Sequence, residues 1–330
     1  MSRALVIGGT LFIGRALVRR LLDRGDRVTI LHRGKSNPFA GETDEIHCDR
    51  NDAEAVRSAL AGRRFDVVYD NVYDWLRGTT AEQVRAAAEA CGDGLARYVF
   101  TSSVAAYQPG ENLAEDAPLA PADHPDAYAR NKAESERMLF RLHREFGFPA
   151  VTLRPPYIYG PENPFYREAF FWDRLLRGRP IIVPGDGSRR MQFVLADDLA
   201  RAAIVAAAAG AAAGRAYNIA IPEAITQEQL VDALARACGR TPKKRFIPRS
   251  LIEEAGGQIF DPPYYFGQYF DMPPITQDTT RARRELGFEA TPFEDGLAGT
   301  FEAYGKERRP EPDFGWEDRL LASLGTSSQA

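Results

Sequence analysis

Three residues of this chain could together carry proton chemistry. Tyr128 and Lys132 are four residues apart in a run that suits a helix, so both side chains would lie on one face. A free tyrosine has a pKa near 10, and lowering it to about 7 requires about 4 kcal/mol of phenolate stabilisation. One ammonium about 4 Å away, in an effective dielectric of about 20, supplies about that much. Ser103, just after a strand-like run, could hydrogen-bond the substrate oxygen, so the three predict a general acid/base set.

A parallel sheet is predicted to position these residues, because short β-branched runs alternate with helical stretches. The strand-like runs are 4–7, 27–31, 66–69, 97–102 and 150–154. After about residue 160 the pattern is less regular and richer in proline, which suits a smaller lobe. We therefore expect an α/β domain over 1–160 and a second lobe over 161–330, interleaved because a strand near 216–221 returns to the main sheet.

A glycine-rich turn joins the first strand to the first helix. Gly8, Gly9 and Gly14 would let bare backbone approach a pyrophosphate, and the helix N-terminus would add N–H donors. The G-x-G-x-x-G pattern is not matched, and a turn that serves only packing is the alternative. The residues predicted to bind the cofactor here are Gly8, Thr10, Leu11, Phe12 and Ile13.

The second strand is predicted to end near two cations rather than a carboxylate. An NAD enzyme commonly places an acidic side chain here on the ribose hydroxyls, whereas this chain has Arg33 and Lys35. Two cations suit a 2′-phosphate, so NADP is favoured over NAD, with ordinary solvated charges as the alternative. Asp49 and Arg50, which follow the third strand, are candidates for the adenine edge.

Composition narrows the function classes. The net charge of −4 over 330 residues, without long basic runs, disfavours a nucleic-acid partner. We expect no signal peptide and no membrane span, because the most apolar-looking stretch, 199–213, contains Arg201 and is shorter than a span of about 20 residues. The cysteines are odd in number and widely spaced, which favours a reducing cytoplasm, and the histidines show no ligand spacing, which predicts no metal. These residues are Cys48, Cys91, Cys238, His32, His47, His124 and His143.

In motif order and spacing the chain resembles the extended short-chain dehydrogenase/reductase family, also called the NAD-dependent epimerase/dehydratase family. The resemblance covers nearly the whole length. It rests on 8–14 (GGTLFIG), 100–103 (FTSS) with Tyr107, Tyr128 with Lys132, 154–161 (RPPYIYGP) and 193–200 (FVLADDLA). The absent middle glycine, together with 32–35 (HRGK) and 48–52 (CDRND), is most similar to an atypical branch that includes chloroplast stem-loop RNA-binding proteins and their bacterial relatives.

The resemblance implies a Rossmann doubly wound parallel sheet that binds NAD(P), with a smaller C-terminal substrate lobe. It implies that Ser103, Tyr128 and Lys132 are catalytic and that Lys132 also holds the nicotinamide ribose. In the Pro-Pro-Tyr run of 155–157, Pro155 is a candidate to lie beside the cofactor and Tyr157 to face its nicotinamide end, with a rigid turn that serves only packing as the alternative. Asn71 would lie beneath the cofactor, where the family usually has a small residue.

Departures from the family pattern restrict the reaction. Sugar 4,6-dehydratases of this family have an Asp-Glu pair where this chain has Val104 and Ala105, so that dehydration is not expected. Many nucleotide-sugar epimerases have an arginine where this chain has Met191, and the adjacent Arg189 and Arg190 are the candidates that would replace it.

We therefore expect an NAD(P)-dependent epimerase or reductase acting on a small molecule, a sugar or nucleotide-sugar, as a homodimer. The sequence does not separate epimerisation from reduction. Two alternatives stay open: an RNA-binding protein that keeps a cofactor fold, and a non-catalytic NAD(P)-binding sensor.

Overall fold

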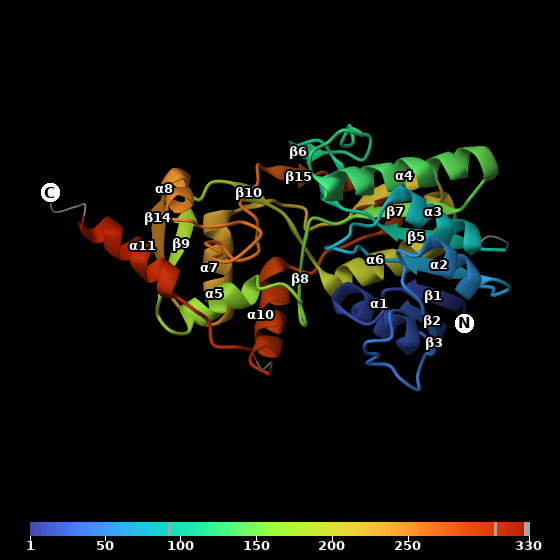
Figure 1. Cartoon of the computed structure of the whole chain (residues 1–330), viewed down its shortest axis with the longest axis horizontal. Helices are drawn as coiled ribbons and strands as arrows, with labels where there is room; N and C mark the ends of the chain where they lie inside the picture. Colours follow the sequence, from blue (N-terminus) through green and yellow to red (C-terminus); the bar gives the residue numbers. More distant parts are fainter. Residues whose placement is uncertain (92–93, 307–308, 327–330) are drawn as a thin grey trace. The chain divides into compact units, whose positions relative to one another are not determined.

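The computed structural model describes residues 1–91, 94–306 and 309–326, and the chain in it forms two compact units (Figure 1). The first unit consists of 1–158, 192–222 and 275–291. The second consists of 159–191, 223–274 and 292–330. The first unit therefore takes two segments from the C-terminal half of the chain, and the two units interleave in sequence.

The first unit is built on a seven-stranded sheet in the order β12-β7-β5-β4-β1-β2-β3, in which every neighbouring pair is parallel. The order reverses between β1 and β4, the switch point at which doubly wound sheets bind ligands. The prediction of a Rossmann fold is confirmed. The strands are β1 (Arg3–Ile7), β2 (Arg27–His32), β3 (Asp44–His47), β4 (Val67–Asp70), β5 (Arg97–Thr101), β7 (Ala150–Arg154) and β12 (Arg215–Asn218).

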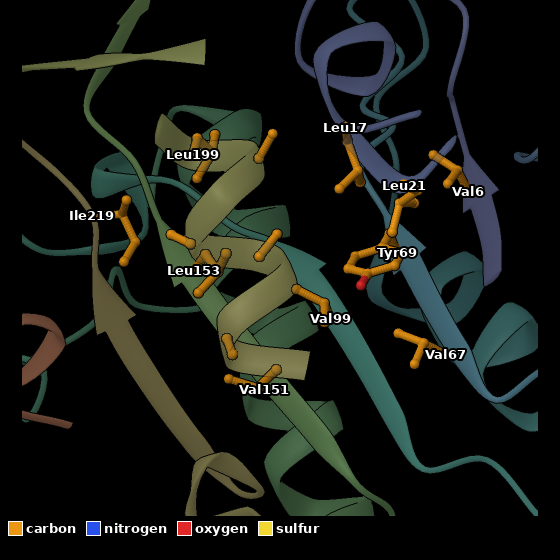
Figure 2. Close-up of a cluster of buried hydrophobic side chains, with 14 of the residues drawn as sticks. Val6, Leu17, Leu21, Val67, Tyr69, Val99, Val151, Leu153, Leu199 and Ile219 are labelled. Carbon is orange, nitrogen blue, oxygen red and sulfur yellow. The ribbon is translucent and has the colours of Figure 1, made fainter. Parts of the chain in front are cut away.

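Helices cover both faces of this sheet, because successive strand residues point to opposite sides. In β1, Ala4 and Val6 pack with α1 (Phe12–Asp23), α6 (Ala196–Ala208) and α9 (Thr280–Leu286). Figure 2 shows this cluster, with Leu17 and Leu21 of α1 and Leu199 of α6 among its labelled side chains. Leu5 and Ile7 pack on the other face with α2 (Ala53–Leu60), α3 (Ala81–Ala90) and α4 (Ala127–Phe146).

Short elements lie outside this sheet. They are η1 (Val104–Ala106), β6 (Gly110–Leu113) paired with β15 (Ile275–Gln277), β8 (Tyr157–Tyr159) paired with β11 (Phe193–Leu195), and η2 (Gly210–Ala212). All belong to the first unit except the last residue of β8, with which the second unit begins. The returning strand is β12, which ends at Asn218 rather than at Ile221. Beyond it, the Ile219 N–H still donates to the Arg154 carbonyl at 3.3 Å, and the Asn218 side chain donates to the carbonyls of Leu113 and Asp278 at 2.9 Å each.

The second unit is mostly helical. Its elements are α5 (Glu168–Leu175), β9 (Pro180–Pro184), β10 (Arg190–Met191), β13 (Ile225–Thr226), α7 (Gln227–Ala237), β14 (Lys243–Ile247), α8 (Arg249–Glu254), α10 (Phe293–Tyr304) and α11 (Gly315–Thr326). Trp172 is buried in its core, donates to the Leu234 carbonyl at 3.0 Å and packs with the rings of Phe301 and Tyr304. Among the helices of the described ranges, none combines the length and apolar character needed to span a bilayer.

Candidate active site

The turn after β1 depends on two glycines that lie against each other. Gly8 has a φ of +82°, a conformation that favours glycine, and its N–H donates to the Leu31 carbonyl at 3.0 Å. A Cβ on Gly14 would lie 1.8 Å from the Gly8 carbonyl oxygen. Only glycine at position 14 therefore lets α1 begin so close to the end of β1.

The N-terminus of α1 offers backbone donors beside this turn. Leu11 is the N-cap residue and makes no side-chain cap, and the described first turn contains no acidic residue. Leu11 is 66% exposed, whereas Phe12 is buried with a positive φ, and Thr10 and Ile13 are half-buried. An uncapped helix start without negative charge suits an anion such as a pyrophosphate.

Asn71 lies directly after β4, next to the switch point. Its side-chain oxygen accepts from the Thr101 hydroxyl at 2.6 Å. Its buried Nδ2 has no hydrogen-bond partner in the described chain. A buried donor without a partner is costly, so this one indicates a place for a bound acceptor. Together with the Gly8 turn, it makes the edge of the sheet fit a dinucleotide.

The cations predicted for a 2′-phosphate lie on the surface after β2. Arg33 and Lys35 are exposed. The Arg33 guanidinium is 3.6 Å from the Asp74 carboxylate, and its side chain is 55% exposed. Such a long, solvated pair is weak, so Arg33 can turn towards an incoming phosphate at little cost.

The two residues predicted for the adenine edge have different environments. Asp49 is half-buried and accepts from Arg77 at 2.8 Å. Arg50 is buried and donates to Asp70 at 2.5 Å and to the Gln83 carbonyl at 2.6 Å. The Arg50 Nε atom is buried and has no hydrogen-bond partner in the described chain, so the ion pair leaves one donor of the guanidinium unused. Contact of Asp49 or of Arg50 with adenine stays a prediction.

Helix α4 carries Tyr128 and Lys132 to the carboxyl end of β5. The Asp126 side chain caps the helix by accepting from the Tyr128 N–H at 2.9 Å. The Lys132 ammonium is buried and donates to the Thr101 carbonyl at 2.6 Å. It lies 4.6 Å from the ring centroid of Phe100 and 5.9 Å from that of Tyr128. Lys132 therefore places its charge beside the tyrosine that it was predicted to activate.

Ser103 is the N-cap residue of η1, the short helix that follows β5. It is buried, and its hydroxyl caps η1 by accepting from the Ala105 N–H at 3.1 Å. The next residue, Val104, donates to the Pro155 carbonyl at 2.9 Å, which ties η1 to the end of β7. Alanines of η1 and α4 form a small buried cluster, namely Ala106, Ala129 and Ala133. This packing brings the element that carries Ser103 against the helix that carries Tyr128.

Two aromatic residues that the sequence analysis did not identify lie on Tyr128. The ring centroids of Tyr73 and Trp75 are 4.6 Å and 4.7 Å from that of Tyr128. The Tyr73 hydroxyl accepts from the Asn131 amide at 3.3 Å, and Trp75 is 57% exposed. The available signal was their position, since aromatic residues that follow the end of a strand next to the switch point face the ligand crevice.

The remaining substrate candidates lie in different units. Tyr157 in β8 is half-buried, with its ring 5.9 Å from that of Phe193. Arg190 in β10 is exposed, belongs to the second unit and donates to the Ala224 carbonyl at 3.5 Å. Contact of either residue with substrate stays a prediction.

Burial of Lys132 predicts a pH-dependent stability difference. Burial lowers the pKa of Lys132 to about 8 from its usual 10.5. Below pH 8 the Lys132 side chain is protonated in both the folded and the unfolded chain, so the buried charge lowers the free energy of unfolding by its full amount. This destabilisation decreases as the pH rises to about 10.5. Lys132→Met removes this destabilisation. The variant should gain stability over the parent at pH 7, and this gain should shrink by about 2 kcal/mol at pH 10, at about 1.36 kcal/mol per pK unit.

Urea unfolding at the two pH values measures this difference. Lys243→Met, at an exposed lysine of β14, is the matched control and should show no such change. A Lys132→Met difference from the parent that is the same at both pH values would contradict the buried-charge interpretation.

A family comparison agrees with this geometry. The model of the NAD dependent epimerase/dehydratase family matches residues 4–220. The chain therefore belongs to the NAD-dependent epimerase/dehydratase family, within the extended short-chain dehydrogenases/reductases, as its motifs predicted.

Its relatives differ in what their names say they do. The chain is 32% identical to the chloroplast stem-loop binding protein of 41 kDa b of Arabidopsis thaliana, over 97% of this chain and 84% of that protein. It is 26% identical to a UDP-glucose 4-epimerase of Mycolicibacterium smegmatis, over 92% of this chain and 98% of the relative. A Thermus thermophilus UDP-glucose 4-epimerase solved in complex with NAD has the same fold, with a TM-score of 0.72 and 22% identity over 93% of this chain and all of that one.

Proposed function

We propose that this protein is an NAD(P)-dependent epimerase or reductase that acts on a hydroxyl or carbonyl group of a sugar or nucleotide-linked sugar. The observation that carries the proposal is the position of Lys132, whose buried ammonium lies beside the Tyr128 ring at the carboxyl end of β5. A tyrosine paired with a buried cation is suited to exchanging a proton with a substrate oxygen near neutral pH.

Each residue of the set has a distinct part in this proposal. The Tyr128 hydroxyl takes the proton from a substrate hydroxyl or returns it to a carbonyl. Lys132 stabilises the phenolate and binds the nicotinamide ribose, and Ser103 hydrogen-bonds the reacting oxygen. When bound, the cofactor supplies hydride acceptance and donation. Epimerisation differs from reduction in that the keto intermediate turns over and is reduced on its other face, and cofactor retained through purification would favour it.

The surroundings of Tyr128 restrict the substrate further. Tyr73 and Trp75 form an apolar cover over the Tyr128 ring, which suits contact with the apolar face of a sugar. Val104 and Ala105 follow Ser103 and have no group that could exchange a proton. Water elimination needs its own acid and base, so we do not propose a 4,6-dehydratase.

Titration calorimetry with NAD and NADP tests the cofactor part of the proposal. We expect tighter binding of NADP. Arg33→Ala should weaken NADP binding by about 10- to 100-fold, the value of one or two charge-assisted hydrogen bonds, and leave NAD binding unchanged. Arg57→Ala, at an exposed arginine of α2, is the control and should change neither affinity.

Each outcome decides something. Equal affinities that Arg33→Ala does not change would remove the 2′-phosphate assignment and leave NAD as the cofactor. Failure to bind either dinucleotide, with none retained from purification, would overturn the enzyme proposal. Cofactor binding without turnover on any sugar would favour a non-catalytic sensor.

The similarity to the chloroplast stem-loop binding protein supports a second candidate, binding of structured RNA. RNA binding is to be tested next if no cofactor binds, with a stem-loop RNA as the probe and the salt dependence of binding as the readout.

We also propose a reducing, cytoplasmic location, because Cys48, Cys91 and Cys238 are free thiols. A homodimer stays part of the proposal, to be tested by light scattering.

A further inference from the structure

Two histidines and a glutamate lie together at the carboxyl ends of β2 and β3. The strands are parallel and in register, with His32 opposite His47. Glu45 lies two residues before His47, so its side chain points to the same face of β3. The histidines lack ligand spacing along the chain, so the sequence predicted no metal site. Strand pairing brings two of them together across fifteen residues.

The three side chains converge on one point. The Glu45 Oε2 atom is 2.8 Å from His32 Nε2 and 3.1 Å from His47 Nε2. The two imidazole rings are 5.0 Å apart and nearly perpendicular, and one ligand atom from each residue lies within 4.8 Å of the others. Within the described ranges, no other group of three such side chains meets this criterion. Modest side-chain movements would bring the three atoms to coordination distance of one ion.

We propose that His32, Glu45 and His47 bind a divalent transition-metal ion of the Zn²⁺ class. Two imidazole nitrogens and one carboxylate oxygen are borderline ligands that suit Zn²⁺ rather than Mg²⁺ or Ca²⁺. Three protein ligands leave a coordination position for water or a further ligand. His47 is 64% exposed and gives access from solvent, whereas buried His32 holds the site to the sheet.

The two histidines already orient the carboxylate, because both Nε2 atoms lie within hydrogen-bond distance of the same Glu45 oxygen. The nearby loop is held by the Asn37 amide, which donates to the Thr43 hydroxyl at 3.2 Å. The cluster includes neither Tyr128 nor Lys132. The site is therefore separate from the proposed acid/base set and does not depend on catalysis.

Binding requires a change of tautomer. Both Nε2 atoms face the carboxylate, and each donates to Glu45 in the tautomer that carries its hydrogen on Nε2. A metal takes those nitrogens only if the hydrogens move to Nδ1. The Nδ1 atom of His32 accepts a long 3.3 Å hydrogen bond from the Gly34 N–H, which must turn away. Gly34 is exposed with a φ of +75°, and as a glycine it can make that change at small cost.

Zn²⁺ titration of the full chain by calorimetry, repeated with Co²⁺ by visible absorption, tests the proposal. We expect one equivalent per chain with micromolar or tighter affinity. His47→Ala should weaken binding at least about tenfold. His124→Ala is the matched control, because His124 is a partly exposed histidine outside the cluster, and it should bind as the parent does.

The outcomes separate cleanly. No saturable binding by the parent up to about 100 μM metal would overturn the proposal. Equal weakening by both histidine variants would also overturn it, because binding would then be diffuse. Circular dichroism checks that His47→Ala is folded, and Glu45→Gln, which keeps the shape of the side chain, provides a second ligand variant that should also weaken binding. Neither readout uses turnover, so failure here leaves the proposed function standing.

Discussion

Tyr128→Phe should lower kcat by about 10³-fold while the protein still binds its cofactor. Removal of the hydroxyl deletes the proton donor and acceptor, and general acid/base catalysis contributes about 10²- to 10⁴-fold. The phenyl ring keeps the contacts of the Tyr128 ring with Tyr73 and Trp75, so the pocket should keep its shape. The loss should therefore fall on kcat rather than on cofactor affinity.

A panel of UDP-linked, dTDP-linked and free hexoses provides the assay, with absorbance at 340 nm for reduction and chromatography for epimers. Tyr217→Phe is the matched control, since its hydroxyl contacts Glu285 at the other side of β12 from the proposed chemistry, and kcat should change little. If Tyr128→Phe keeps more than about a tenth of the parent kcat, Tyr128 is not the general acid/base.

Gly14→Ala should destabilise the protein by about 3 kcal/mol and abolish cofactor binding. The added Cβ would lie 1.8 Å from the Gly8 carbonyl oxygen, and that oxygen belongs to backbone that cannot rotate away as a side chain would. Relief of the contact has to move α1 away from the turn, which also moves the backbone donors that would hold the phosphates.

Gly299→Ala is the control, because Gly299 is also helical but a Cβ there meets nothing within 4 Å. That substitution should stabilise the protein by up to about 1 kcal/mol through helix propensity. Urea unfolding and cofactor titration of both variants make the comparison. Equal stability of the two variants would mean that the turn relaxes more easily than the close contact suggests.

Local patterns in the sequence were sufficient for the fold. Alternating strand and helix runs predicted a Rossmann sheet, and the structure confirms it. The backbone at positions 8 and 14 requires glycine, so the turn could be recognised from the residue types alone. The spacing of Tyr128 and Lys132 predicted one helix face, since that periodicity is a property of the helix alone.

Contacts between segments that are distant in the chain could not be predicted from local sequence patterns. Arg50 was predicted to contact adenine. The structure shows its guanidinium in a buried ion pair with Asp70, the last residue of β4. Tyr73 and Trp75 reach Tyr128 only because the loop after β4 lies against the first turn of α4. Which residues face one another there depends on strand order and on the path of the loops.

Backbone conformation and periodicity are encoded over a few neighbouring residues, so the amino-acid order was enough to predict the sheet, the glycine turn and the acid/base candidates. The folded chain was needed to show that Lys132 is buried against Phe100, that Arg50 is buried in an ion pair, and that His32 and His47 share Glu45. Burial and charge pairing depend on residues tens of positions apart, and the packing of the folded chain alone brings those together.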